Sequence, residues 1–186
     1  EIRAKYQLPD HYILNVGSIE ERKNALSAVQ ALMMLPEQIH LVIVGRHTEY
    51  TDKIERFIKE NKLEERVHII SNVPFDDLPV FYQLAEIFVY PSRFEGFGIP
   101  IIEALYSGIP VVAATGSCLE EAGGPDSIYV HPDDIKGMAN AFKQIYSDTE
   151  RKKEMIEKGQ KFAKRFSEEK QAVEILNIYK KLMKWT

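Results

Sequence analysis

The sequence predicts a doubly wound α/β domain built on a parallel sheet of about six strands. Short apolar runs rich in β-branched residues recur along the chain, and most of them end at Gly or Pro. Within each run, apolar residues follow one another directly and do not alternate with polar ones. Between the runs lie segments whose apolar residues follow helical spacing. Strands covered by helices on both faces have this pattern, and strand–helix alternation joins parallel strands by right-handed crossovers.

The expected elements follow from these runs. Six segments are expected as strands: 12–16, 41–44, 67–70, 87–90, 111–113 and 128–130. Three apolar faces at helical spacing lie between them, formed by Ala25, Val29, Leu32 and Met33, by Ile54, Phe57, Ile58 and Leu63, and by Leu78, Phe81, Tyr82 and Ala85. Asp76 and Asp77 are candidate N-caps of the third helix. From Asp133 onward the pattern predicts only helices.

Composition limits the function classes. The chain has 186 residues, 45% of them hydrophobic, which is enough for one domain whose core needs no disulfide or metal. A formal net charge of −4 gives no electrostatic basis for nucleic acid as a partner. The lone cysteine, Cys118, excludes an internal disulfide and a cysteine-built metal site. No apolar stretch approaches the roughly 18 residues of a membrane span, so we expect a cytoplasmic domain.

Three regions are expected along the chain. Residues 1–10 are interpreted as the end of an interdomain linker or helix, residues 11–166 as the α/β domain, and residues 167–186 as a C-terminal helix. The abrupt opening of the sequence favours a chain that is part of a longer protein.

Two loops at the carboxyl ends of expected strands carry the candidate chemistry, because ligands of open parallel sheets bind there. The first loop, residues 17–24 (GSIEERKN), places Arg22 and Lys23 at the start of the next helix. Cations are unfavourable at a helix N-terminus unless an anion such as a phosphate joins them. Two interpretations stay open: a phosphate-binding loop, or two solvated cations neutralised by Glu20 and Glu21.

The second loop follows the fourth expected strand and leads into a helix. Gly96 and Gly98 allow backbone amides of this loop to approach a ligand closely. Glu103 lies in an otherwise apolar helix, so we expect it to face a cleft or a polar ligand. Phe94 and Phe97 flank Gly96 and are candidates either for the walls of that cleft or for the core.

Other chemistries lack their motifs. Gly96 and Gly98 are not followed by the third glycine of a dinucleotide fingerprint, and the chain has no phosphate-binding P-loop and no HExxH zinc motif. The five histidines are scattered without ligand spacing, and Cys118 has no evident base. We interpret these residues as structural or solvated.

The segment 92–104 (SRFEGFGIPIIEA) resembles the signature of the group 1 (family 4) retaining glycosyltransferases of GT-B fold. Residues 17–24 resemble the donor phosphate loop of that family, and 121–124 (EAGG) and 130–134 (VHPDD) resemble its closing segments. The resemblance runs from about residue 12 to residue 179. It implies a Rossmann-like domain that is one half of a GT-B fold, namely the C-terminal donor-binding domain, with extra C-terminal helices.

The resemblance assigns roles to individual residues. Glu95 would bind hydroxyls of the transferred sugar and help stabilise positive charge at its anomeric carbon, while Glu103 would accept hydrogen bonds from the ribose. Lys23, together with Arg22, would neutralise the diphosphate as it leaves. The remaining donor-binding positions lie in the loops around the nucleotide: Gly17, Ser18, Val73, Pro74, Leu78, Gly96, Phe97, Gly98 and Ile99.

The resemblance also implies a reaction. A sugar, expected to be mannose, rhamnose or glucose, would pass from a nucleotide-diphosphate sugar to an acceptor hydroxyl with retention of configuration. No cofactor and no metal are expected, in keeping with the lack of an Asp-x-Asp pattern. The acceptor would bind to an N-terminal domain absent from this sequence, toward which the helix at 167–186 would pack, and the isolated chain would be inactive. The complete enzyme could associate peripherally with the inner face of a membrane.

Departures from the family pattern and two rival functions stay open. Ser18 stands where many members have Arg, so Arg22 is expected to supply that charge, and the Arg-Lys-Asn variant of the loop favours mannosyl- or rhamnosyltransferases. One rival is a non-catalytic nucleotide-binding module, which the presence of Glu95 and Lys23 disfavours. The other is a different GT-B enzyme, such as a nucleotide-sugar epimerase or a phosphorylase, which the context of Glu95 and the lack of an identifiable pyridoxal-phosphate lysine disfavour.

Overall fold

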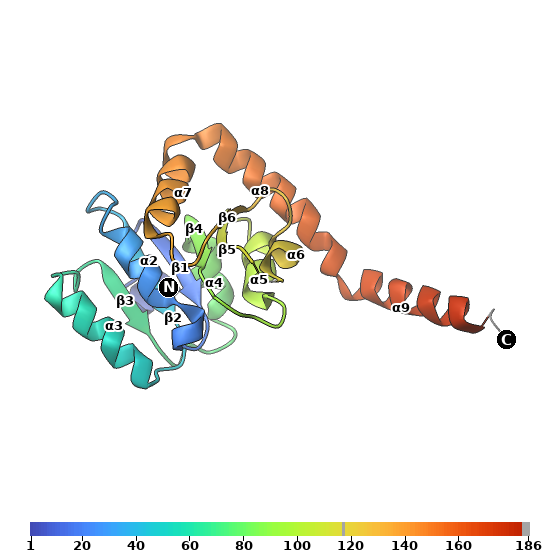
Figure 1. Ribbon diagram of the computed structural model, residues 1–186, viewed down its shortest axis with the longest axis horizontal. Helices are drawn as coiled ribbons and strands as arrows, with labels where there is room; N and C mark the ends of the chain where they lie inside the picture. The colour runs from blue at the N-terminus through green and yellow to red at the C-terminus, as the bar shows by residue number, and fades with distance from the viewer. Residues whose placement is uncertain (117, 184–186) are drawn as a thin grey trace.

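The computed structural model describes residues 1–116 and 118–183 and confirms the predicted fold class (Figure 1). A six-stranded, wholly parallel sheet in the order β3-β2-β1-β4-β5-β6 forms a Rossmann-like core. All six expected strands are present, and β2 also includes His40 while β5 also includes Ala114. The strands are β1 (Tyr12–Val16), β2 (His40–Val44), β3 (Val67–Ile70), β4 (Ile87–Tyr90), β5 (Val111–Ala114) and β6 (Ile128–Val130).

Helices connect the strands and extend beyond them. The α-helices are α1 (Ile2–Lys5), α2 (Ala25–Leu32), α3 (Glu49–Glu60), α4 (Leu78–Leu84), α5 (Ile99–Tyr106), α6 (Leu119–Gly123), α7 (Ile135–Ser147), α8 (Thr149–Ala163) and α9 (Glu168–Met183). Two short 3-10 helices are η1 (Glu21–Lys23) and η2 (Lys164–Phe166).

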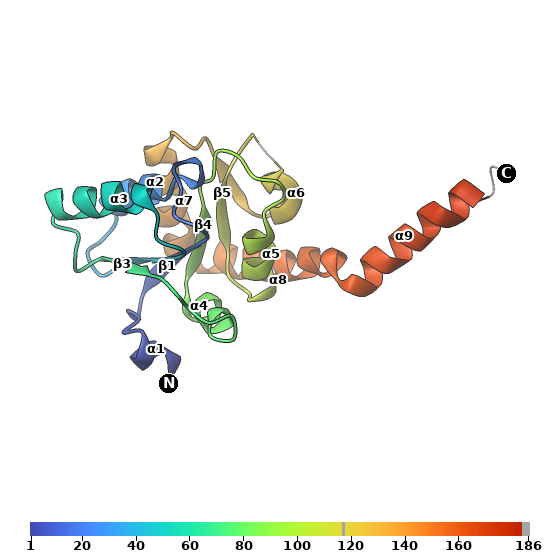
Figure 2. The ribbon, with the colours of Figure 1, turned by 90° about the horizontal axis from the view of Figure 1, so that it is seen from below.

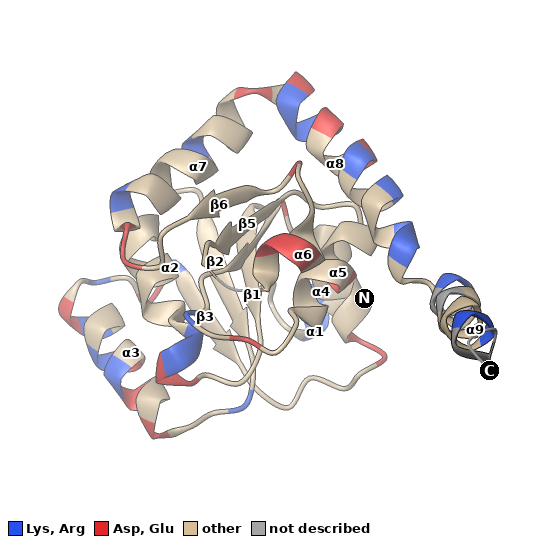
Figure 3. Cartoon of the chain, turned by 45° about the vertical axis from the view of Figure 1, so that its right-hand side comes forward, with Lys and Arg blue, Asp and Glu red and all other residues tan. Residues whose placement is uncertain are grey.

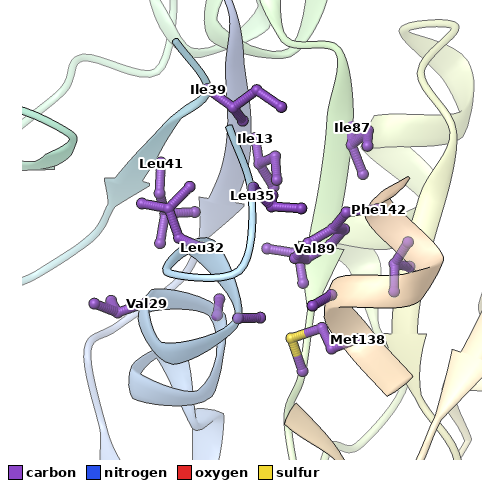
Figure 4. Close-up of a cluster of buried hydrophobic side chains, with 14 of the residues drawn as sticks. Ile13, Val29, Leu32, Leu35, Ile39, Leu41, Ile87, Val89, Met138 and Phe142 are labelled. Carbon is purple, nitrogen blue, oxygen red and sulfur yellow. The ribbon is translucent and has the colours of Figure 1, made fainter. Parts of the chain in front are cut away.

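Two apolar cores, one on each face of the sheet, hold the helices in place. Helices α2, α3 and α7 pack on one face, and α1, α4, α5 and α6 on the other (Figure 2). Figure 4 shows the first core, in which Val29 and Leu32 of α2 and Phe142 of α7 gather with Ile13 and Val89 of the central strands. The expectation that strands are buried on both faces holds for the inner strands, whereas the edge strands β3 and β6 are largely half-buried.

Two expectations about local structure were wrong. Met33 is 46% exposed, because α2 ends at Leu32 and Met33 lies beyond the buried face. Asp77 occupies the N-cap position of α4, but its side chain makes no capping hydrogen bond. Its carboxylate instead accepts hydrogen bonds from Lys5 Nζ and Tyr6 Oη, both at 2.6 Å, and these lower its pKa. The bonds tie the first residues of the chain to α4.

The C-terminal helices leave the body of the domain. Helix α8 packs along α5, whereas α9 projects away from the sheet (Figures 1 and 2). The helix expected at 167–186 is therefore present, and its residues 184–186 lie outside the described residues. Charged residues of both signs, Lys and Arg as well as Asp and Glu, are frequent on the outer helices α3 and α8 (Figure 3). None of the described helices combines the length and the apolarity needed to cross a membrane.

Candidate functional site

The candidate site lies where the strand order reverses. The chain builds outward from β1 to β2 and β3 on one side, then returns to β4 beside β1 and continues to β5 and β6. In open α/β sheets, the crevice beyond the carboxyl ends of the strands at such a switch point is where ligands bind. The two loops singled out by the sequence follow β1 and β4, so the fold brings them side by side.

The loop after β1 is shaped by η1 and by Asn24. The sequence places Arg22 and Lys23 in the first turn of the helix, but α2 begins only at Ala25, and both cations lie in η1 before it. Asn24 adopts a left-handed conformation (φ 56°), and its buried amide donates to the carbonyls of Pro91 and Pro132 at 3.2 and 2.9 Å. These long-range hydrogen bonds fix the turn at Asn24, which positions the side chains of Arg22 and Lys23.

The cations of η1 converge on Glu95. Nη1 of Arg22 lies 3.4 Å and Nζ of Lys23 lies 3.5 Å from the same oxygen, Oε1, of the Glu95 side chain, which is only 11% exposed. That oxygen also accepts hydrogen bonds from Tyr90 Oη at 3.0 Å and from Ser92 Oγ at 2.9 Å. Three predicted catalytic residues are therefore in contact, in a cluster that we call the Glu95 cluster: Arg22, Lys23, Tyr90, Ser92 and Glu95.

Arg22 is held by further partners in the same loops. Its Nε donates to Glu20 at 3.0 Å, and its Nη1 donates to the carbonyl of Phe94 at 3.0 Å. Ser18 donates to the other oxygen of Glu20 at 2.6 Å, and this bond is the main cause of the lowered pKa of Glu20. Ser18 therefore helps to position Arg22 indirectly, because both side chains donate hydrogen bonds to the carboxylate of Glu20.

Glu103 lies on α5 beside a cavity. Tyr82 Oη donates to its Oε2 at 2.7 Å, and burial raises the pKa of Tyr82, so that the hydroxyl keeps its proton. The cavity holds about 210 Å³, and its remaining lining residues are Phe75, Leu78, Pro79 and Ser107. Glu103 thus faces a cleft, as its sequence context predicts.

A second cavity of about 390 Å³ lies between the carboxyl ends of β1 and β2. It is lined by Val16, Gly17, Ser18, Val44, Gly45, Arg46, Asn72, Val73 and Leu78. Four of the predicted donor-binding residues therefore meet here, whereas Pro74 does not line either cavity, and Leu78 lines both. A side chain at Gly45 would come within 1.8 Å of the Gly17 carbonyl, so only glycine fits the floor of this cavity.

The glycine-rich segment turns sharply into α5. Gly98 is the N-cap residue of α5 with φ 104°, a conformation that favours glycine. Gly96 faces open space, and Ile99 is 62% exposed. Phe94 is also exposed, at 71%, but the Phe97 ring packs edge-on against Phe166 at 5.6 Å. Of the two candidate cleft walls, Phe97 is therefore a packing residue, and Phe94 stays open to solvent.

Sequence reasoning missed three residues that contact the carboxylates. Tyr82 and Tyr90 lie in apolar runs, where a tyrosine fits the pattern as well as a phenylalanine does. Ser92 is visible only through its position directly after β4 and Pro91. The Cys118 thiol, at the N-cap of α6, donates to the backbone carbonyl of Glu95 at 3.2 Å.

Within the part of the chain that the structure describes, one group of side chains could hold a metal ion. Among the described residues, His47, Asp52 and Glu55 at the start of α3 bring their ligand atoms within 4.8 Å of one another, and all three are exposed. None of them belongs to the Glu95 cluster or lines the two cavities.

Fold and site together define a Rossmann-like domain with a ligand crevice at its switch point. A family model described as "Glycosyl transferases group 1" matches residues 1–162. The chain therefore belongs to the glycosyl transferases group 1 family, and its fold is that of the C-terminal domain of such an enzyme.

Individual relatives agree with this family. O-antigen chain mannosyltransferase B of Escherichia coli is 33% identical over 186 residues, which cover 97% of this chain and 49% of that protein. O-antigen chain mannosyltransferase RfbU of Salmonella typhimurium is 33% identical over 136 residues, covering 73% of this chain and 38% of that protein. The structure of sucrose-phosphate synthase from Thermosynechococcus elongatus superposes with a TM-score of 0.87 and 28% identity, over all of this chain and 49% of the other. The chain spans half or less of the length of these relatives.

Proposed function

We propose that the chain is the donor-binding domain of a retaining hexosyltransferase, which transfers a sugar from a nucleotide-diphosphate sugar to an acceptor hydroxyl. The convergence of Glu95 with Arg22 and Lys23 carries this proposal. Charge develops on the leaving diphosphate and at the anomeric carbon in such a reaction, and preorganised charges of opposite sign stabilise both. The cluster holds both signs of charge at the switch point.

The position of the nucleoside follows from the two cavities. The cavity beside Val73 and Gly45 would take the base, and Glu103, in the adjoining cavity across Leu78, would accept hydrogen bonds from the ribose hydroxyls. Backbone amides of Phe97, Gly98 and Ile99, at the N-terminus of α5, would contact the sugar and the distal phosphate.

In this mechanism, Arg22 and Lys23 neutralise the diphosphate, and no metal ion takes part. The proposed sugar is mannose, ahead of rhamnose and glucose. Two relatives at 33% identity are named mannosyltransferases, and the Arg-Lys-Asn loop favours the same group. The complete enzyme would act in the cytoplasm, at the inner face of a membrane.

The acceptor would bind to a second, N-terminal domain of the complete enzyme, so that the present chain alone would bind donor without transferring its sugar. Helix α9 would pack toward that domain, because Val173, Ile175, Leu176, Ile178 and Tyr179 are 53–60% exposed. The relatives are about twice the length of the chain, which leaves room for such a domain.

Thermal unfolding of the chain with GDP, UDP and ADP tests the proposed function. At about 100 times its dissociation constant, a bound nucleotide adds about 2.7 kcal/mol of stability, which shifts the midpoint by roughly 5–10 °C for a domain of this size. The shift should be lost in Lys23→Ala and Glu103→Ala and kept in the control Lys153→Ala, whose side chain pairs with Glu150 on α8. No shift with any of the three nucleotides would contradict the proposal.

A further inference from the structure

We propose that Tyr90 and Tyr82 are positioning residues, each of which orients one carboxylate of the Glu95-to-Glu103 signature for the donor. The inference rests on the proposed function and extends it to two residues outside the recognised segment. The buried hydroxyl of Tyr82, on α4, donates to Glu103, and that of Tyr90, on β4, donates to Glu95.

Tyr90 links the sugar-binding carboxylate to the phosphate-binding cation. Its hydroxyl donates to Glu95 Oε1 at 3.0 Å and accepts from Lys23 Nζ at 3.3 Å. All four side-chain contacts of the Glu95 cluster reach Oε1, so, within the described residues, Oε2 is left to accept a hydrogen bond from a sugar hydroxyl. The hydroxyl of Tyr90 thus helps to fix the rotation of the Glu95 carboxylate, so that its second oxygen is held in one position.

Tyr82 does the same for Glu103. Its hydroxyl donates to Oε2 at 2.7 Å, and the Glu103 side chain lines the cavity beside Leu78. A carboxylate on a helix rotates freely about its terminal bond unless a partner fixes it. A single strong hydrogen bond from a rigid donor is enough to set that rotation.

The two tyrosines are themselves rigid. Both are 2% exposed, and the Phe88 ring contacts both of them, with ring centroids 5.4 Å from Tyr82 and 5.9 Å from Tyr90. Burial raises the pKa of both phenols, so each hydroxyl stays protonated and acts as a donor. The contacts with Phe88 therefore help to hold two donors in place, one for each carboxylate.

A matched control exists in the same core. Tyr12 is also fully buried, and its hydroxyl donates to the backbone carbonyl of Phe81 at 2.6 Å rather than to a carboxylate. Tyr12→Phe, Tyr82→Phe and Tyr90→Phe remove the same atom from similar surroundings. Only Tyr82→Phe and Tyr90→Phe remove a hydrogen bond to a carboxylate of the signature.

The test uses the complete enzyme, with nucleoside diphosphate binding and steady-state transfer measured for each variant. Tyr90→Phe should lower kcat at least about tenfold and change the Kd for nucleoside diphosphate less than about twofold. Tyr82→Phe should raise that Kd about tenfold with little change in kcat. Tyr12→Phe should change neither, and 3-fluorotyrosine at position 90, which keeps the ring and its hydroxyl, should retain wild-type transfer.

Double-mutant cycles make the test specific. Adding Tyr90→Phe to Glu95→Ala should cause no further loss of transfer, whereas adding it to Glu103→Ala should multiply the two losses. Unaltered kinetics in Tyr90→Phe and Tyr82→Phe, or changes of the same size in Tyr12→Phe, would overturn the inference. If the wild-type enzyme itself binds no nucleoside diphosphate and transfers no sugar, the proposed function fails, and the inference fails with it.

Discussion

Replacing Glu95 by Gln should strengthen the binding of a nucleoside diphosphate while it removes most of the transfer activity. The substitution keeps the shape of the side chain and an acceptor oxygen for the hydroxyls of Tyr90 and Ser92. It removes the negative charge that lies 3.4 and 3.5 Å from Arg22 and Lys23. In the wild type, that charge competes with the phosphates for the same two cations.

The magnitude follows from the spacing of the charges. A phosphate would contact the two cations on the side opposite to Glu95. If its contacts are as long as those of Glu95, 3.4 and 3.5 Å, the phosphate lies about 7 Å from the Glu95 carboxylate. Coulomb repulsion at that distance is about 0.6–2.4 kcal/mol per unit of phosphate charge, for effective dielectric constants of about 80 to 20. Salt screens part of this repulsion, so we expect a gain of about 1 kcal/mol, or roughly fivefold tighter binding.

Isothermal titration calorimetry with the diphosphate that binds the wild type measures the effect. The gain should shrink as salt is raised, because the cluster is partly open to solvent. Glu150→Gln is the control, since it changes the net charge by the same amount on α8, where Glu150 pairs with Lys153. Weaker or unchanged binding in Glu95→Gln, or an equal gain in Glu150→Gln, would refute this account of the cluster.

Three further predictions concern stability. Arg66→Met should lower the free energy of unfolding by about 2–4 kcal/mol in urea titrations. The guanidinium donates to the carbonyl of Leu32, the last residue of α2, at 3.1 Å and to carbonyls of the connection between α2 and β2. A loss below about 0.5 kcal/mol would contradict this. Nδ1 of His40 lies 3.0 Å from Nε2 of His68, and burial lowers the pKa of both from 6.5. The unfolded chain therefore binds protons more readily, so stability should fall as pH drops below about 6.5, and less steeply in His68→Gln; equal slopes between pH 7 and 5 would reject this assignment. Gly98→Ala should cost about 1–3 kcal/mol because its φ of 104° is strained for alanine, whereas Gly96→Ala, which faces open space, should cost less.

The fold could be predicted because its signals are local. Each inner strand is a largely apolar run that is directly preceded or followed by glycine or proline, and burial on both faces favours that composition. The start of α2 could not be predicted, since it depends on the left-handed turn at Asn24. That turn is held by carbonyls of Pro91 and Pro132, which are distant in the sequence. No pattern within one segment reports such a contact.

The site could be predicted in part for a similar reason. Glu103 stands out because charge is rare in an otherwise apolar helix, whereas Glu95 and Lys23 receive their roles from the resemblance of their segments to the family signature and its phosphate loop. Tyr82 and Tyr90 do not stand out, because an apolar pattern does not distinguish a tyrosine whose hydroxyl reaches a carboxylate from one, such as Tyr12, whose hydroxyl reaches a backbone carbonyl. The difference lies in the tertiary structure, which places α4 against Glu103 of α5 and the end of β4 beside Glu95 in the loop before α5.

The spacing between the two carboxylates also has a structural reason. Glu95 precedes the turn at Gly98 and points back to the loop after β1, whereas Glu103 lies a full turn into α5 and faces α4. If fewer residues separated the two acids, both carboxylates would lie in the loop before α5. If α5 extended back through Gly98 to residue 95, Glu95 would point away from Lys23. The glycine-rich turn therefore separates two acids that are close in sequence, and under the proposed function the donor would lie between the cations of η1 and the cavity beside Leu78.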